Sequence, residues 1–324
     1  MHSQLEERHQ FRLLELHPGS PGDTIKATLV TKDLRDAPYY EAMSYVWGDM
    51  DDRVDILVDD RNFKITKNLH DALENLKLPT SIRILWTDQV CIDQYHNTEK
   101  QDQVHMMDEI YKAADGVIVY LGQSTEQTEI DMQHLQSFME RYGQREERPW
   151  SHIAVPELEQ SVSRILTRPW FGRMWTVQEA VLARRITLQC GRHKIRWTCD
   201  LGTLRALVFR IKAAVVSPIY NLHRRDESEL DWTPLLYILE SQMRQAARRE
   251  YFILQRNLLD VAFDFRHRRS TMLHDMYYAI LGIVESDQGG KLLDVQYNIP
   301  AEEVYERFRA AVQRISEIED VPLA

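Results

Sequence analysis

The stretch "IRILWTDQVCIDQYHNTEKQDQVHMMDEIYKAADGVIVYLG", residues 82–122, decides the fold of this chain. It opens with a short apolar run that indicates a buried strand, and it closes with a second such run at residues 116–122. Between the two runs, one apolar stripe at helical spacing is formed by Val104, Met107, Tyr111 and Ala114. Two apolar strands joined by a helix predict neighbouring parallel strands in a covered sheet.

The same alternation extends to both sides of this unit. "AMSYVWGD" (residues 42–49) and "ITLQCG" (186–191) have the composition of two more strands, and each ends in a glycine-containing turn. "NLHDALENLKL" (68–78) has leucines at helical spacing. The first part of the chain is therefore predicted to be α/β, with a parallel sheet and helices on both of its faces.

The pattern changes to helices alone near residue 200. The segments with helical patterns are "LGTLRALVFRIKAAVV", "TPLLYILESQM", "YFILQRNLLDVAF", "MLHDMYYAILGIV" and "AEEVYERFRAAVQRI". We therefore expect two parts, an α/β domain at residues 1–200 and a mostly helical C-terminal region at residues 201–324 that packs on it.

Charge and apolar content exclude several classes of protein. The formal net charge of −10 argues against a general binder of nucleic acid or of anionic membranes, because phosphate groups favour basic surfaces. The one basic run, "RHRR" at residues 266–269, is expected to be a solvated surface with a helix-end or loop role. No apolar run approaches the roughly 20 residues that a membrane-spanning helix needs.

The cysteines and the first residues favour a reducing compartment. The three cysteines, Cys91, Cys190 and Cys199, form no CxxC pair. Their number is odd, so they could not all pair in disulfides within the chain, as they would in a disulfide-stabilised fold. The polar start "MHSQLEERHQ" shows no signal peptide, so a cytoplasmic location is expected. Glycine-rich phosphate-binding motifs are absent from the sequence.

Polar residues follow the predicted strands where parallel sheets bind ligands. Trp47, Gly48 and Asp49 end the first strand, and Asp88 follows the strand that begins at residue 82. Because the carboxyl ends of parallel strands meet at one edge, these residues are candidates for a ligand-binding cleft. Each aspartate has an alternative interpretation as a turn former or a helix N-cap.

A second candidate segment is "RMWTVQEAVLA", residues 173–183, which is apolar except around Gln178 and Glu179. Trp175 and Glu179 are four residues apart and share a helical face. An indole and a carboxylate on one face suit a flat, polar or cationic ligand. The alternative is a core tryptophan beside a glutamate in a salt bridge with Arg173 or Arg184.

Two other chemistries have weaker support. Cys190, His193 and Cys199 are a possible zinc set, but the first of them reads as the end of a strand, so no metal is expected. Cys91 with His96 or His105 is a possible nucleophilic pair, but its apolar surroundings are expected to raise the thiol pKa.

Three blocks, "YEAMSYVWGD", "ILWTDQVCIDQ…QVHMMDEIYKAADGVIVYLG" and "RPWFGRMWTVQEAVLA", resemble the signature blocks of the HET (heterokaryon incompatibility) domain of filamentous fungi. They occur in order between residues 39 and 191. "HDMYYAILGI" and "VQYNIPAEEVYERF" resemble segments that follow this domain. Thr87 departs from the family pattern, which usually has an apolar residue there, and His274 stands where arginine is common.

The resemblance implies an effector or regulator of fungal non-self recognition and programmed cell death. HET domains are in turn distantly similar to TIR domains, and this likeness implies an α/β, TIR-like (flavodoxin-like) parallel sheet. The catalytic helix of TIR domains reads Trp-Cys-x-x-Glu, the spacing of Trp175 and Glu179. Enzymatic TIR domains cleave the nicotinamide–ribose bond of NAD, so this resemblance implies NAD as a candidate substrate and Glu179 as the catalytic residue. The substrate-binding residues would then be Trp47, Gly48, Asp49, Asp88, Arg173, Trp175 and Gln178.

No cofactor is expected. The partners expected are further copies of the chain, through self-association on activation, and an unidentified protein partner or sensor. The alternative to the enzyme is a non-catalytic signalling module that acts through protein–protein association.

Overall fold

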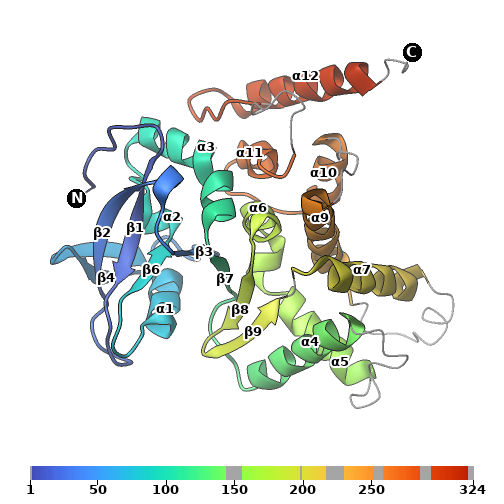
Figure 1. Ribbon diagram of the computed structural model, residues 1–324, viewed down its shortest axis with the longest axis horizontal. Helices are drawn as coiled ribbons and strands as arrows, with labels where there is room; N and C mark the ends of the chain where they lie inside the picture. The colour runs from blue at the N-terminus through green and yellow to red at the C-terminus, as the bar shows by residue number, and fades with distance from the viewer. Residues whose placement is uncertain are drawn as a thin grey trace.

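The computed structural model describes residues 2–143, 155–197, 199–216, 230–250, 258–284 and 293–319. These residues form one broad sheet surrounded by helices, with further helices contributed by the second half of the chain (Figure 1). This architecture confirms the predicted fold class, which is α/β with a helical C-terminal region. The division into two domains stays a prediction.

The described residues contribute nine strands to the sheet, in the order β5-β4-β2-β1-β6-β3-β7-β8-β9. The strands are β1 (Gln10–Leu16), β2 (Lys26–Asp33), β3 (Glu41–Tyr45), β4 (Arg53–Val58), β5 (Arg61–Thr66), β6 (Arg83–Trp86), β7 (Gly116–Tyr120), β8 (Ile186–Cys190) and β9 (His193–Trp197). The four strands predicted from the sequence are β3, β6, β7 and β8. They pair in parallel in the order β6-β3-β7-β8, which is the order of the first four strands in flavodoxin-like sheets.

The sheet is mixed, whereas the sequence predicted a parallel sheet. β1 runs antiparallel to β6, and β9 runs antiparallel to β8, so the four predicted strands form a parallel group only at the centre. Outside this group, β2 pairs in parallel with β4. The prediction missed β2 and β4 because their residues are only partly buried. They therefore lack the continuous apolar run that marks a parallel strand covered on both faces.

Helices cover both faces of the central strands. The helices are α1 (Lys67–Leu76), α2 (Asp88–Cys91), α3 (Asn97–Ala113), α4 (Thr128–Gly143), α5 (Val155–Leu166), α6 (Trp175–Leu182), α7 (Leu201–Val216), α9 (Thr233–Glu250), α10 (Leu258–Phe265), α11 (Asp275–Leu281) and α12 (Ala301–Glu319), with short 3-10 turns η1 (Leu34–Asp36) and η2 (Pro169–Gly172). In Figure 1, α3 and α6 lie above the central strands, and α1, α4 and α5 lie below them.

The C-terminal helices largely follow the predicted pattern. α7, α9, α11 and α12 each lie on a segment with predicted helical spacing. The segment "YFILQRNLLDVAF" is described only from residue 258, where α10 begins, and its residues 251–257 lie outside the described part of the chain.

The short helix α6 lies between the sheet and the C-terminal helices. It contacts β3 and β7 on one side and α3, α9 and α11 on others. Every residue from Thr176 to Leu182 is buried, as expected of a helix that is apolar on almost all sides. Gln178 and Glu179 are therefore inside the protein, where polar groups need partners.

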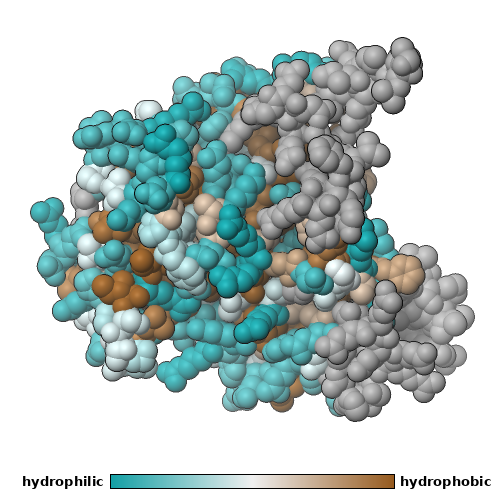
Figure 2. Space-filling view, viewed as in Figure 1, coloured by the Kyte–Doolittle hydropathy of each residue, from teal (hydrophilic) through white to brown (hydrophobic). Residues whose placement is uncertain are grey.

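The residues that Figure 2 colours by hydropathy are mostly hydrophilic on the face shown. Its hydrophobic residues lie in small separate groups among polar ones, as is usual for protein surfaces. Among the described residues, none of the helices combines the length and the apolar character needed to cross a bilayer.

Candidate functional site

A cavity of about 420 Å³ lies beyond the carboxyl ends of β3 and β6. Open parallel sheets bind ligands at this edge, and the volume is typical of small-molecule sites. The walls come from the segments after β3 and β6, from α3 and α6, and from two C-terminal segments. The lining residues are Tyr45, Val46, Trp47, Gly48, Met50, Asp88, Ile92, Gln94, Lys100, Val104, Met107, Arg173, Trp175, Glu179, Arg269, Ser270, Thr271, Met272, Asp275 and Tyr297.

Glu179 lies in the wall of this cavity and is only 6% exposed. Ser44 Oγ donates a hydrogen bond to Glu179 Oε2, and the indole nitrogen of Trp170 donates to Ser44 Oγ over 2.7 Å. Burial raises the pKa of Glu179 to about 8, against the opposing effects of the Ser44 hydrogen bond and of the charge on Arg173. The carboxyl group therefore titrates close to neutral pH.

The alternative interpretation of Glu179, as a residue in a salt bridge with Arg173 or Arg184, does not hold. Within the described ranges Glu179 forms no ion pair with Arg173 or Arg184, and its carboxyl group is held by a neutral hydroxyl instead. The group is thus buried without a formal counter-charge in contact, and it faces a cavity.

Asp88 is the first residue of α2, and only Thr87 separates it from the end of β6. Its carboxylate accepts hydrogen bonds from the hydroxyl of Tyr45 over 3.0 Å and from the indole of Trp47 over 2.8 Å. Thr87 Oγ1 in turn donates to the hydroxyl of Tyr45 over 3.1 Å. Burial raises the pKa of Asp88. Asp88 therefore orients Trp47 in the cavity wall.

Arg173 and Trp175 enter the cavity from the junction of η2 and α6. Burial raises the pKa of Asp88, Glu179 and Asp275, and the positive charge of Arg173 opposes that shift in all three. Arg173 is therefore the cation that all the acids of the cavity share.

Gly48 lines the cavity in the left-handed backbone region, with φ of +80°. A side chain at this position would be strained, so the turn after β3 needs glycine here. The turn is also held by Asn68 of α1, whose amide donates to the carbonyl of Val46 over 2.5 Å.

Two of the predicted site residues do not line the cavity. Asp49 is exposed, and its carboxylate accepts from the backbone N–H of Asp51 over 2.9 Å, as a turn former does. Gln178 is buried and accepts from the backbone N–H of Gly282 over 3.2 Å, which ties α6 to the end of α11. The other predicted residues are brought together in the wall.

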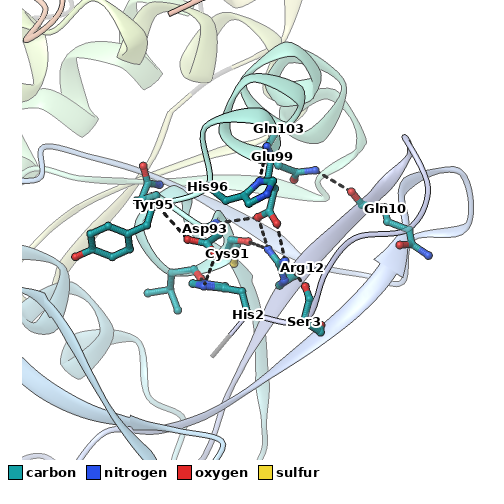
Figure 3. A network of polar contacts seen from close by, with 12 residues as sticks. His2, Ser3, Gln10, Arg12, Cys91, Asp93, Tyr95, His96, Glu99 and Gln103 are labelled. Carbon is teal, nitrogen blue, oxygen red and sulfur yellow. Dashed lines mark hydrogen bonds and ion pairs between the residues drawn. The ribbon is translucent and has the colours of Figure 1, made fainter. Parts of the chain in front are cut away.

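A buried polar network supports the segment that carries Asp88 (Figure 3). The guanidinium of Arg12 on β1 pairs with Glu99 of α3 at 2.6 Å and 2.9 Å. It also donates to the carbonyls of Cys91 and Ser3, and Glu99 accepts from the backbone N–H of Asp93. The network thereby fixes both the end of α2 and the start of α3.

Several lining residues were not predicted from the sequence. One of them is Tyr45, which lies within the block quoted for the first strand. Ser44, which holds Glu179 without lining the cavity, was also missed, and a serine in a buried strand was the available signal. Other lining residues that carried no ligand-binding pattern in the sequence are Lys100 of α3 and, in the C-terminal region, Arg269, Asp275 and Tyr297.

The expectation for residues 266–269 was wrong in part. Arg266 and His267 are exposed at the end of α10, as expected for a helix end. Arg268 is buried and donates to the carbonyl of Arg173 and to Thr176 Oγ1, both over 3.0 Å. Arg269 lines the cavity. The run is therefore partly internal, because it packs against the start of α6.

The described part of the chain holds no cluster of three potential metal-ligating side chains. Cys91 is buried, and burial raises its thiol pKa to about 12, as its apolar surroundings predicted. Such a thiol is a poor nucleophile.

The sequence of this chain is similar to a known protein family and to a curated relative. Residues 40–179 match the family described as "Heterokaryon incompatibility protein (HET)". The chain is also 32% identical over 229 residues to "Heterokaryon incompatibility protein 6, OR allele" of Neurospora crassa, an alignment that covers 56% of this chain and 33% of that protein. The chain therefore spans about a third of the length of this curated relative.

No solved structure matches the chain, so the distant likeness to TIR domains stays a prediction. The family match includes the cavity residues from Tyr45 to Glu179, whereas those from Arg269 onward lie beyond it. Over residues 40–179 the chain is thus similar to the heterokaryon incompatibility (HET) family.

Proposed function

We propose that this protein acts in fungal heterokaryon incompatibility and cell death, and that it cleaves the nicotinamide–ribose bond of NAD with Glu179 as the catalytic carboxylate. The name of the Neurospora relative supports the biological role. The observation that carries the chemical role is a buried carboxyl group, Glu179, in the wall of a cavity that also presents two indoles, Trp47 and Trp175, and the cation Arg173.

The chemistry suits a single carboxylate. The C–N bond to ribose breaks, its electron pair leaves with the neutral nicotinamide, and the ribose carbon becomes an oxocarbenium-like cation. A negative charge held close to that carbon stabilises the cation without any need to protonate the leaving group. Water then adds to the carbon and releases a proton, so the products are nicotinamide, ADP-ribose and H⁺.

The environment of Glu179 bears on its catalytic form. Burial holds the pKa of its carboxyl group at about 8, so a cationic nicotinamide ring in the cavity would favour the ionised form by direct attraction. Ser44 stabilises the same ionised form through its hydrogen bond. Aromatic faces suit a cationic ring as well, which fits the two indoles in the wall.

A time course of NAD, nicotinamide and ADP-ribose with the purified chain tests the proposal. We expect equal amounts of both products, and a specific activity that rises with protein concentration because we propose that activation proceeds by self-association. The matched control is Glu109→Gln, which changes an exposed glutamate of α3 in the same way. Folded protein that releases no nicotinamide at any concentration would refute NAD cleavage.

One observation favours a second candidate, a non-catalytic signalling module. The Trp170–Ser44–Glu179 chain of hydrogen bonds satisfies the buried carboxyl group internally, as a purely structural residue requires. Expression of Glu179→Gln in a fungal host separates the two functions. The enzyme predicts that growth arrest is lost in this variant but kept in Glu109→Gln, whereas the signalling module predicts arrest in both.

A further inference from the structure

The C-terminal segment around Arg269 joins the HET domain at the mouth of the cavity. The backbone N–H of Arg269 donates to the carbonyl of Gly172 over 2.7 Å, and its carbonyl accepts from the backbone N–H of Met174 over 2.9 Å. These two bonds make Arg173 and Arg269 partners in a parallel β-bridge. The bridge thus holds two residues that are distant in sequence side by side. Arg173 lies inside the family match, and Arg269 lies beyond it.

This register places two guanidinium groups at one cavity. Side chains of bridged partners project to the same side of the two backbones, and both arginines line the cavity. Like charges on paired residues destabilise a fold unless an anion lies between or beside them. The pairing therefore has an electrostatic cost, which solvent reduces because Arg269 is exposed and Arg173 is half-buried.

The acids of the cavity do not offset this charge by direct contact. Asp88 is held by Tyr45 and Trp47, and Asp275 accepts from the hydroxyl of Tyr297 over 2.7 Å. Within the described residues, neither arginine of the bridge has a carboxylate at ion-pair distance. Two cations held by the backbone and not by acids are suited to a ligand that brings its own negative charge.

Arg268 makes the arrangement rigid. It is buried, and its guanidinium donates to the carbonyls of Arg173 and Pro234 and to Thr176 Oγ1, each over 3.0 Å. It therefore connects α9, the start of α6 and the bridge itself. The backbone positions of the two cavity arginines are set before any ligand arrives, which lowers part of the entropic cost of binding.

We infer that Arg173 and Arg269 together bind the diphosphate of a dinucleotide, so that the C-terminal region completes a binding site that the HET domain only begins. Guanidinium groups match phosphate oxygens with paired hydrogen bonds, and two adjacent groups match two linked phosphates. The inference rests on the proposed function for the identity of the dinucleotide, because cleavage of NAD at ribose would leave ADP-ribose bound through this diphosphate.

Calorimetric titration of the whole chain with ADP-ribose, inorganic pyrophosphate and adenosine tests the inference. We expect ADP-ribose and pyrophosphate to bind to the wild-type chain, and adenosine to bind far more weakly. Arg269→Gln is expected to weaken ADP-ribose binding at least about tenfold, the usual effect of losing hydrogen bonds to a charged group. Arg266→Gln is the matched control, because it removes the same charge from an exposed position in the same run. Only the backbone of Arg269 makes the bridge, so its variant is expected to fold normally.

The outcomes separate this inference from the proposed reaction. Binding of ADP-ribose that is lost in Arg269→Gln supports the inference even if wild-type protein never releases nicotinamide. Nicotinamide release with the same KM for NAD in Arg269→Gln and wild type overturns it and leaves the reaction intact. Equal ADP-ribose binding by wild type and Arg269→Gln, or no binding by either, also overturns it.

Discussion

Replacing Glu179 with glutamine is expected to lower the rate of nicotinamide release by about a hundred- to a thousandfold, the usual cost of removing one preorganised group that stabilises charge in a transition state. The amide is nearly isosteric and can still accept the hydrogen bond from Ser44, so the cavity should keep its shape. The loss should appear in kcat, because the negative charge acts on the cation that develops during bond cleavage.

The same variant is expected to be more stable than wild type at alkaline pH. Glu179 has its folded-state pKa raised to about 8 from an ordinary value of 4.5, so the native protein binds a proton that the unfolded chain has lost. Stability of the wild type therefore falls as pH rises from 4.5 to 8, by about 4 to 5 kcal/mol from this group alone. Glutamine does not titrate, so the variant escapes this loss.

Urea unfolding of both proteins at pH 5 and pH 9 measures this effect, with Glu109→Gln as the exposed control. The expected result is a variant that gains stability relative to wild type between the two pH values while it loses activity. A variant that is less stable than wild type at pH 9 would show that the charged form of Glu179 stabilises the fold, contrary to its burial.

Replacing Arg12 with methionine is expected to cost about 3 to 5 kcal/mol of unfolding free energy, because it leaves the partner carboxylate of a buried ion pair uncompensated. The Arg12 side chain is 1% exposed and that of Glu99 is 10% exposed. The carbonyls of Cys91 and Ser3 lose their donors as well. Because this network holds the segment from α2 to α3, the variant is also expected to bind ligands near Asp88 less tightly than the wild type does.

Two controls test whether the effect comes from the buried charge. Removing the carboxylate as well, in Arg12→Met with Glu99→Gln, should recover part of the lost stability, because the two residues contact each other and their effects are coupled. Arg307→Met removes an exposed partner of Glu303 and should cost less than about 1 kcal/mol. Equal losses from Arg12→Met and Arg307→Met would show that the network of Figure 3 contributes little.

Much of the fold was predictable because its signals are local. The buried strands β3, β6, β7 and β8 are short apolar runs, and α1 is preceded by its N-cap Thr66, whose side chain accepts from the N–H of Leu69. The strands β2 and β4 carry no such run and gain their structure by pairing with neighbours. Strand pairing depends on partners far along the chain, so the mixed character of the sheet was not predictable.

The candidate site was predictable only in part, for a similar reason. Asp88 and Asp49 both follow a strand, yet only Asp88 lines the cavity, because Tyr45 and Trp47 turn toward it. Arg269 and Tyr297 carry no signal, because their role arises from contact with segments that lie far away in the sequence.

The sequence by itself determined the α/β class, the helical second half and the presence of a carboxylate and an amide inside an apolar helix, since these follow from residue type and spacing. Tertiary structure alone decided which of the two neighbours faces the cavity. Successive residues on a helix point about 100° apart, so Gln178 meets Gly282 at the end of α11 while Glu179 meets Ser44 and the cavity. That choice depends on which elements pack around α6, and no local pattern encodes it.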